Sequence, residues 1–145
     1  MQWSNDKNGG FSSAQADSLI LPALAEGPFG YRTVNVADQQ RDPASLLHWI
    51  KRLVDLRKSC PEIGIGHGDV GRTDTTSVFS YLYRSGERTI VTLHNMASDP
   101  REVSIKEELN GEPRVLLGDP RSRPRDDDPS HAHLDGFGYL WYTVE

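Results

Sequence analysis

The sequence predicts a mainly β fold, in which a small antiparallel β-sandwich follows a long loop and one amphipathic helix. Three observations favour this class. Residues 1–42 are rich in Gly, Pro, Asn, Asp and Ser and keep neither helical nor strand periodicity. A single apolar stripe at helical spacing comes next. Beyond residue 63, short runs of aromatic and β-branched residues alternate with turns, which is typical of an antiparallel sandwich.

The helix is expected from about Pro43 to Ser59. Asp42 suits its N-cap, because a carboxylate accepts hydrogen bonds from the free amides of the first turn. Pro43 suits the first helical position, where its missing N–H costs nothing, and Pro61 is expected to end the helix. Its stripe follows the i, i+3/4, i+7 spacing of one apolar face: Leu46, Leu47, Ile50, Leu53 and Val54.

The clearest strands form a predicted hairpin of residues 77–83 and 89–95, turned at residues 84–88. In its first arm, Val78 and Leu82 share one face, and the aromatic residues Phe79, Tyr81 and Tyr83 share the other, so both faces require cover. Further strands are expected over residues 102–105, 114–117 and 138–144. Residues 119–135 are heavy in Asp, Arg, Pro and His, and we expect them to form a long exposed loop.

Composition excludes several function classes. The 145 residues carry a net charge of −5, and the whole excess lies beyond residue 62, so the surface repels phosphate backbones and nucleic acid is not an expected partner. Mean hydropathy is −0.58, and no apolar run approaches the length of a membrane span. Cys60 is the only cysteine, which rules out an intrachain disulfide and favours a spectator thiol. With no secretory signal at the N-terminus, cytoplasmic residence is expected.

Four stretches carry a family resemblance: Met1-Gln2-Trp3 with its Asn/Asp/Gly turn and Phe11, Tyr31–Val36 with Gln39–Pro43, Ser45–Trp49, and Phe137–Tyr142. They resemble the α-amylase superfamily, in particular its trehalose synthases and oligo-1,6-glucosidase-like α-glucosidases. The resemblance implies that residues 1–62 are the last loop and helix of an incomplete (β/α)8 barrel. It implies that residues 63–145 are the C-terminal β-sandwich. The Arg-Thr-Pro that those families place before Met-Gln-Trp is absent here.

The resemblance also bears on catalysis. Glycoside chemistry of this kind needs two carboxyl groups held about 5–5.5 Å apart on rigid elements, and the family places them on earlier barrel strands. Asp126, Asp127 and Asp128 are the densest acidic run, but successive residues of a loop make a poor preorganised pair. The expectation is a non-catalytic C-terminal fragment with a structural, stabilising role for the barrel, without a cofactor. The alternative is a stand-alone accessory module that binds α-glucan or sugar weakly.

Gln2 and Trp3 are the expected sugar contacts when a barrel is present, because an indole face stacks on a pyranose ring and an amide can bridge two hydroxyls. Trp141 is expected in the core rather than on a carbohydrate platform. His131 and His133 lie near several aspartates, but their loose spacing favours a polar loop over a metal site. Residues 5–10 place oxygen ligands at short intervals, yet Lys7 and the missing distal acid favour a turn over a calcium loop.

The helix stripe creates one more expectation. A contiguous exposed apolar stripe is unfavourable, so the stripe must find cover. A homodimer sealed by this helix is therefore a hypothesis for the chain.

Overall fold

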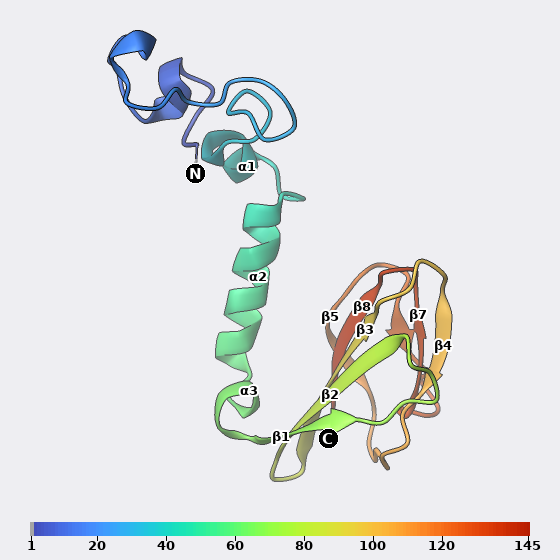
Figure 1. The fold of residues 1–145 in the computed structure, drawn as a ribbon. Helices are drawn as coiled ribbons and strands as arrows, with labels where there is room; N and C mark the ends of the chain where they lie inside the picture. The colour runs from blue at the N-terminus through green and yellow to red at the C-terminus, as the bar shows by residue number, and fades with distance from the viewer. Residues whose placement is uncertain (1) are drawn as a thin grey trace. The chain divides into compact units, whose positions relative to one another are not determined.

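The computed structural model describes residues 2–145; Met1, the first residue of the Met-Gln-Trp motif, lies outside the described residues. The chain divides into two compact units, Met1–Asp55 and Leu56–Glu145 (Figure 1). The division falls inside helix α2 (Leu46–Ser59). The domain boundary at residue 62 stays a prediction. Most regular structure lies in antiparallel sheets, as the predicted mainly β class requires.

The N-terminal unit is irregular over residues 2–35, apart from two short 3₁₀ turns, Lys7–Gly10 and Ala16–Ser18. It then forms helix α1 (Val36–Arg41), so the expectation of loop throughout residues 1–42 was wrong. Asn35 caps α1: its Oδ1 accepts from the Asp38 N–H at 2.9 Å, and its Nδ2 donates to the Tyr31 carbonyl at 2.9 Å. An Asn followed three residues later by an acid was the available signal for this cap.

Helix α2 begins at Leu46, three residues later than predicted. Asp42 is instead the C-cap of α1, and its Oδ1 accepts from the Ala44 N–H at 2.9 Å. Ser45 stands immediately before α2, and its Oγ accepts from the His48 N–H at 3.4 Å, which gives the helix its cap. The predicted end at Ser59 is confirmed. No residue of α2 is buried. Across residues 2–145, no helix has the length and apolarity that crossing a membrane requires.

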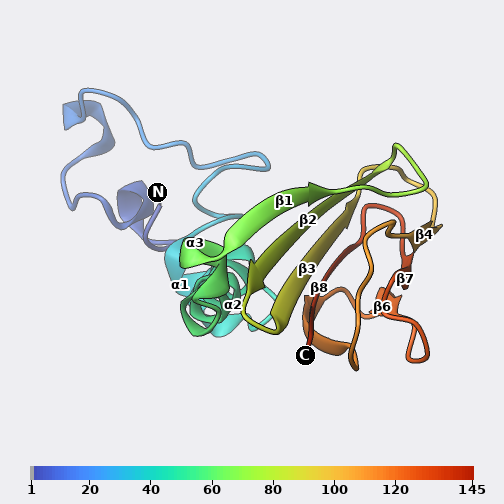
Figure 2. The same cartoon turned by 90° about the horizontal axis from the view of Figure 1, so that it is seen from below.

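The C-terminal unit begins with the end of α2 and the short helix α3 (Glu62–Ile65) and then forms a sandwich of two antiparallel sheets. The first sheet has the order β1-β2-β3-β8-β5, and the second has the order β4-β7-β6. Figure 2 shows β1, β2, β3 and β8 side by side, with β4, β6 and β7 in the second layer. The bounds are β1 His67–Gly71, β2 Val78–Ser85, β3 Arg88–Asn95, β4 Arg101–Ser104, β5 Arg114–Gly118, β6 Arg123–Pro124, β7 His131–Leu134 and β8 Tyr139–Val144.

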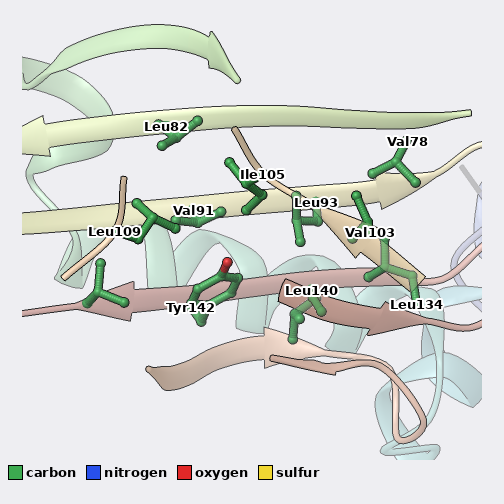
Figure 3. Close-up of a cluster of buried hydrophobic side chains, with 12 residues drawn as sticks. Val78, Leu82, Val91, Leu93, Val103, Ile105, Leu109, Leu134, Leu140 and Tyr142 are labelled. Atoms are coloured by element: carbon green, nitrogen blue, oxygen red, sulfur yellow. The ribbon is translucent and has the colours of Figure 1, made fainter. Parts of the chain in front are cut away.

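The predicted hairpin is confirmed as β2 and β3, which pair from Val78↔Asn95 to Ser85↔Arg88. Gly86 lies at the connection with φ of +60°, a conformation that glycine adopts at no steric cost. Burial alternates along β2 as the sequence predicts, with Val78 and Leu82 buried and Phe79 exposed. The core lies between the two sheets, where inward side chains gather (Figure 3): Val78, Leu82, Val91, Leu93, Val103, Ile105, Leu109, Ala132, Leu134, Leu140, Tyr142 and Val144.

The predicted exposed loop at residues 119–135 was the largest error, because β6 and β7 lie within it. Strand β7 pairs with β4 on one side and β6 on the other, and it buries Ala132 and Leu134 completely or nearly so. The polar residues of His131–Leu134 alternate with its apolar ones at the period of two that marks a strand. The surrounding Asp, Arg and Pro residues concealed this short pattern. Strand β1 was also not predicted.

The outer face of the five-stranded sheet, defined here by the side chains that point away from the core, is covered at one end by residues 60–65. Helix α3 packs on β2, and Ile90 and Thr143, which belong to this face by register, are almost completely buried. Cys60 is also buried, 1% exposed. Toward the middle of the face, Trp141 Nε1–H donates to His94 Nε2 at 3.2 Å. The two rings meet edge to face with centroids 6.3 Å apart.

The first prediction concerns β7. Leu134→Ala should lower the free energy of unfolding by about 2–5 kcal/mol, because it leaves a cavity between the two sheets. Chemical denaturation measures the loss, and Val115→Ala, at a half-exposed position of β5, is the matched control and should change stability little. An unchanged stability in Leu134→Ala would return residues 119–135 to an exposed loop.

The second prediction concerns pH. Burial lowers the pKa of His94 below its ordinary value of 6.5. The unfolded chain therefore takes up this proton at a higher pH than the folded chain does. The contribution of His94 to the free energy of unfolding is fully present above about pH 6.5. It is lost as the pH falls through the pKa of His94 in the folded chain. His94→Gln keeps an acceptor for Trp141 but cannot titrate, so its denaturation midpoint should change less than that of the parent between about pH 7 and pH 5. Equal pH dependence in the two proteins would contradict this assignment.

Candidate functional site

Gln2 and Trp3 lie in a backbone clamp inside the N-terminal unit. The carbonyls of Gln2 and Trp3 accept from the N–H groups of Val36 and Ala37, both at 3.0 Å, and the Trp3 N–H donates to the Gly9 carbonyl at 2.8 Å. The segment is thus held between the turn at residues 6–10 and the first turn of α1. The clamp gives these two residues a fixed backbone position.

Their side chains differ in what they offer. Gln2 Nε2 donates to the Phe29 carbonyl at 2.6 Å, so this amide already helps to hold the following loop. Trp3 is 57% exposed, and part of its indole surface is open to a ligand. The exposed Trp3 indole is therefore better placed to stack on a sugar than the Gln2 amide is to bridge two hydroxyls. The structure does not test either sugar contact, and both stay predictions.

The turn at residues 5–10 directs its polar groups inward to its own loop. Asn8 has φ of +56° and is buried, and its Nδ2 donates to the carbonyls of Ser12 and Ala14 at 3.0 and 2.9 Å. Lys7 Nζ donates to Gln15 Oε1 at 3.0 Å. Gly9 and Gly10 adopt positive φ, where a Cβ would meet Tyr31 at 3.1 Å and Ser4 Oγ at 2.8 Å. These contacts are those of a structural turn.

A surface depression lies where α1 and the start of α2 meet the preceding loop. Its lining includes the apolar side chains of Phe29, Val34 and Leu46 and the polar side chains of Asp38 and Gln39. Phe29 and Leu46 are 75% and 67% exposed. Sequence reasoning missed this depression, because it depends on α1, and the Asn35–Asp38 capping pattern was the signal that could have located it.

The second group of candidates lies on the three-stranded sheet. His131 and His133 alternate with buried residues along β7, so they share its solvent-facing side. Each is held by a separate carboxylate: His131 Nδ1 lies 2.7 Å from Asp128 Oδ2, and His133 Nδ1 lies 2.7 Å from Glu102 Oε1. Among the described residues, no group of three or more His, Cys, Asp and Glu side chains is placed to hold a metal ion.

The acidic run at residues 126–128 is divided among different partners. Asp127 Oδ1 accepts from Arg125 Nε at 3.2 Å, while Asp128 binds the Ser130 N–H and His131. The Ser130 N–H, followed by His131, holds the pKa of the Asp128 carboxyl below its usual range. An ionised carboxylate that already accepts these bonds is a poor proton donor.

The outer face of the five-stranded sheet carries a row of aromatic residues on β2 and β8. The rings of Tyr81 and Tyr83 have centroids 4.8 Å apart, and those of Phe79 and Tyr81 lie 6.5 Å apart. Trp141 belongs to this face and is half-buried, whereas its neighbours Leu140 and Tyr142 enter the core. The expectation that Trp141 is a core residue was therefore wrong, because the period of two assigns it to the other side of β8.

Comparison with known proteins shows which proteins this chain resembles. Residues 1–66 match the family model of the α-amylase catalytic domain. The trehalose synthase of Pimelobacter sp. (strain R48) is 30% identical over 151 residues, which cover 99% of this chain and 26% of that protein. The probable oligo-1,6-glucosidase 2 of Bacillus subtilis (strain 168) is 28% identical over 99 residues, which cover 68% of this chain and 16% of that protein.

A solved structure shares the fold. Trehalose-6-phosphate hydrolase of Bacillus licheniformis superposes with a TM-score of 0.76 at 19% identity, over 99% of this chain and 25% of that one. The chain thus spans about a quarter of the length of the first curated relatives it matches. The chain resembles the C-terminal part of α-amylase-superfamily proteins, in particular of trehalose synthases and oligo-1,6-glucosidase-like α-glucosidases, which are enzymes that act on carbohydrates.

Proposed function

We propose that this chain is a non-catalytic C-terminal part of a trehalose-synthase-like or α-glucosidase-like enzyme, in which the β-sandwich stabilises a (β/α)8 barrel. In this proposal residues 1–62 are the last loop and helix of the barrel and residues 63–145 are the sandwich. The parent chemistry is isomerisation or hydrolysis of an α-glucoside.

One observation carries the proposal: the sandwich is joined to the family-matched segment by a packed, ion-paired connection. Arg88 lies on the outer face, and its guanidinium donates to Glu62 Oε1 at 2.8 Å and to Thr143 Oγ1 at 3.2 Å. The side chains of Glu62 and Arg88 are 9% and 24% exposed. Glu62 belongs to α3, within residues 1–66 that match the catalytic-domain family. Such a connection fixes α3, the end of the matched segment, on the sandwich.

The remainder of the outer face supports the same role. Phe79 is 46% exposed and Val70 of the neighbouring strand β1 is 64% exposed, beside the half-buried rings of Tyr81 and Trp141. A contiguous apolar and aromatic surface of this kind marks an interface. Residues 60–65 cover one end of this outer face, and the helical surface of a barrel would cover the rest.

A non-catalytic role agrees with the state of the carboxylates. Glycoside hydrolysis needs an acid and a second carboxyl group on opposite sides of the scissile bond, each held in a rigid position. Asp127 and Asp128 each bind a neighbouring cation or amide on the protein surface. In the proposal Gln2 and Trp3 contribute sugar contacts only with the barrel present, and Trp3 supplies most of them.

The alternative of an α-glucan-binding accessory module has less support. The rings of Tyr81 and Tyr83 pack on each other, with a tilt of 49° between their planes. The indole N–H of Trp141 is bonded to His94. These aromatic side chains are engaged within the sheet, and a flat stacking platform requires ring faces turned toward the ligand.

The third prediction tests the stabilising role. A Pimelobacter trehalose synthase lacking the stretch aligned with this chain should melt at a higher temperature when the chain is added, because ligand binding to the folded state raises Tm. Phe79→Asp places a charge on the outer face and should remove the shift. Val115→Asp is the matched control and should keep it, since Val115 is similarly exposed but pairs with the inward-facing Tyr142.

Two outcomes would contradict the proposal. An unchanged melting temperature with the parent chain would exclude stabilisation. Turnover of maltose or an aryl α-glucoside by the purified chain alone would exclude a non-catalytic role; no product is expected.

The fourth prediction concerns the connection. Arg88→Ala leaves Glu62 nearly buried without its cation and should destabilise the C-terminal unit by about 2–4 kcal/mol in denaturant. Arg114→Ala removes an arginine whose ion pair with Glu145, at 3.7 Å, is exposed on both sides, so this change should cost less than about 1 kcal/mol. Similar losses in the two variants would show that the Glu62–Arg88 pair does not hold the connection.

A further inference from the structure

The chain contains the dipeptide Asn-Gly twice, at Asn8-Gly9 and at Asn110-Gly111. In this dipeptide the main-chain nitrogen of the glycine can attack the side-chain amide carbon of the asparagine, because glycine has no Cβ to hinder the approach. The attack requires an asparagine side chain that can rotate and a glycine N–H that no hydrogen bond holds. The two dipeptides therefore differ in reactivity if the fold holds them differently.

The reacting groups of Asn8 and Gly9 are fixed by hydrogen bonds. Asn8 is 6% exposed, and its Nδ2 donates to the carbonyls of Ser12 and Ala14 at 3.0 and 2.9 Å. The Gly9 N–H, which would have to attack, donates to the Asp6 carbonyl at 2.9 Å. Reaction at Asn8 thus requires local opening of the turn, and the free energy of that opening slows the reaction.

Asn110 and Gly111 are held by no such bonds. Both residues are exposed, in the irregular segment between β4 and β5. Across residues 2–145, neither the Asn110 side chain nor the Gly111 N–H has a hydrogen-bond partner. Their reacting atoms are open to solvent and can rotate toward each other without breaking any contact of the fold.

The fold also requires glycine at position 111. Gly111 has φ of +116°, and a Cβ there would lie 2.1 Å from the Glu145 carbonyl oxygen, so no other residue fits. On one side of the dipeptide, Leu109 is fixed in the core, and on the other side β5 begins at Arg114. The reactive pair is therefore a short exposed link between two anchored neighbours.

We infer that Asn110 is a site of spontaneous deamidation and that Asn8 is protected from it. The Gly111 nitrogen gives its proton to hydroxide and forms a bond to Cγ of Asn110. The Cγ–Nδ2 bond breaks, and ammonia leaves with a proton from water, so that a cyclic imide remains. Water then opens the imide. Cleavage of the bond from the nitrogen to Cγ yields aspartate, and cleavage of the bond to the main-chain carbonyl carbon yields isoaspartate.

The two products change the chain in different ways. Each adds one negative charge to a chain whose net charge is −5, beside the exposed carboxylates of Glu108 and Glu112. Only isoaspartate lengthens the main chain, by one carbon between Leu109 and β5. Since Gly111 lies against the backbone of Glu145, the added atom disturbs the link that joins the two sheets. The inference concerns the sandwich by itself and does not rest on the proposed role toward a barrel.

Incubation of the purified chain in mildly alkaline buffer, followed by peptide mapping with mass spectrometry, tests the site. In the folded chain, deamidation at Asn110 should be more than about tenfold faster than at Asn8. The same incubation in urea is the control, because unfolding releases the bonds of Asn8, and the two rates should become similar. Equal rates in the folded chain overturn the inference, and so does a difference that persists in urea.

Two variants test the assignment to Asn110. Asn110→Gln keeps the amide but lengthens the side chain, which makes ring closure slow, so the acidic species seen by isoelectric focusing should disappear. Asn5→Gln is the matched control, because Asn5 is exposed but is followed by Asp6, and it should keep that species. An acidic species of unchanged abundance in Asn110→Gln overturns the assignment.

The effect on the link between the sheets has its own test. The isoaspartate form, separated by ion exchange, should unfold at a lower urea concentration than Asn110→Asp, which carries the same charge on an unaltered main chain. Equal unfolding midpoints of these two proteins overturn the effect on the link.

Discussion

The need to cover both faces of one β-sheet governs this molecule. The five-stranded sheet directs Leu82, Leu93 and Leu140 to one side, where the three-stranded sheet buries them completely. On the opposite side it carries Ile90, Tyr81 and Trp141. If a sheet has one apolar and one polar face, packing a second sheet on the apolar face buries all of its apolar surface. Here residues 60–65 cover one end of the outer face, and in the proposed function the rest of that face is a surface for a partner.

The sequence predicted those features that depend on local periodicity. The β2–β3 hairpin followed from alternation between Val78, Leu82 and the aromatic residues, and α2 followed from its stripe. What failed depended on contacts between distant residues. Leu134 is buried because β7 pairs with β4, some 30 positions earlier, and no local pattern in an Asp- and Arg-rich stretch indicates that pairing. Asp42 was assigned to the wrong helix because α1 ends there, and a capping residue fits either terminus of a tight connection.

The candidate site shows the same limit. The sequence identified Gln2 and Trp3 through a resemblance, but it could not indicate that Gln2 bonds to the Phe29 carbonyl while Trp3 remains exposed. That difference arises from the fold of residues 24–35, which is irregular and has no periodicity. The polar cluster on β7 shows a second limit. Composition alone suggests a metal site at His131, His133 and the nearby carboxylates, but each histidine bonds to its own acid. Residue type without geometry overestimates such sites.

Two incomplete surfaces, the outer face of the sheet and the stripe of α2, place different demands on a partner. The outer face is aromatic and partly covered already, so under the proposed function it suits a large surface of fixed shape. Under the same proposal α2 is the last helix of the barrel, so the barrel covers its stripe as well. The core of the sandwich lies between its own two sheets and needs no partner. The sandwich is therefore the part of the molecule best suited to a structural role.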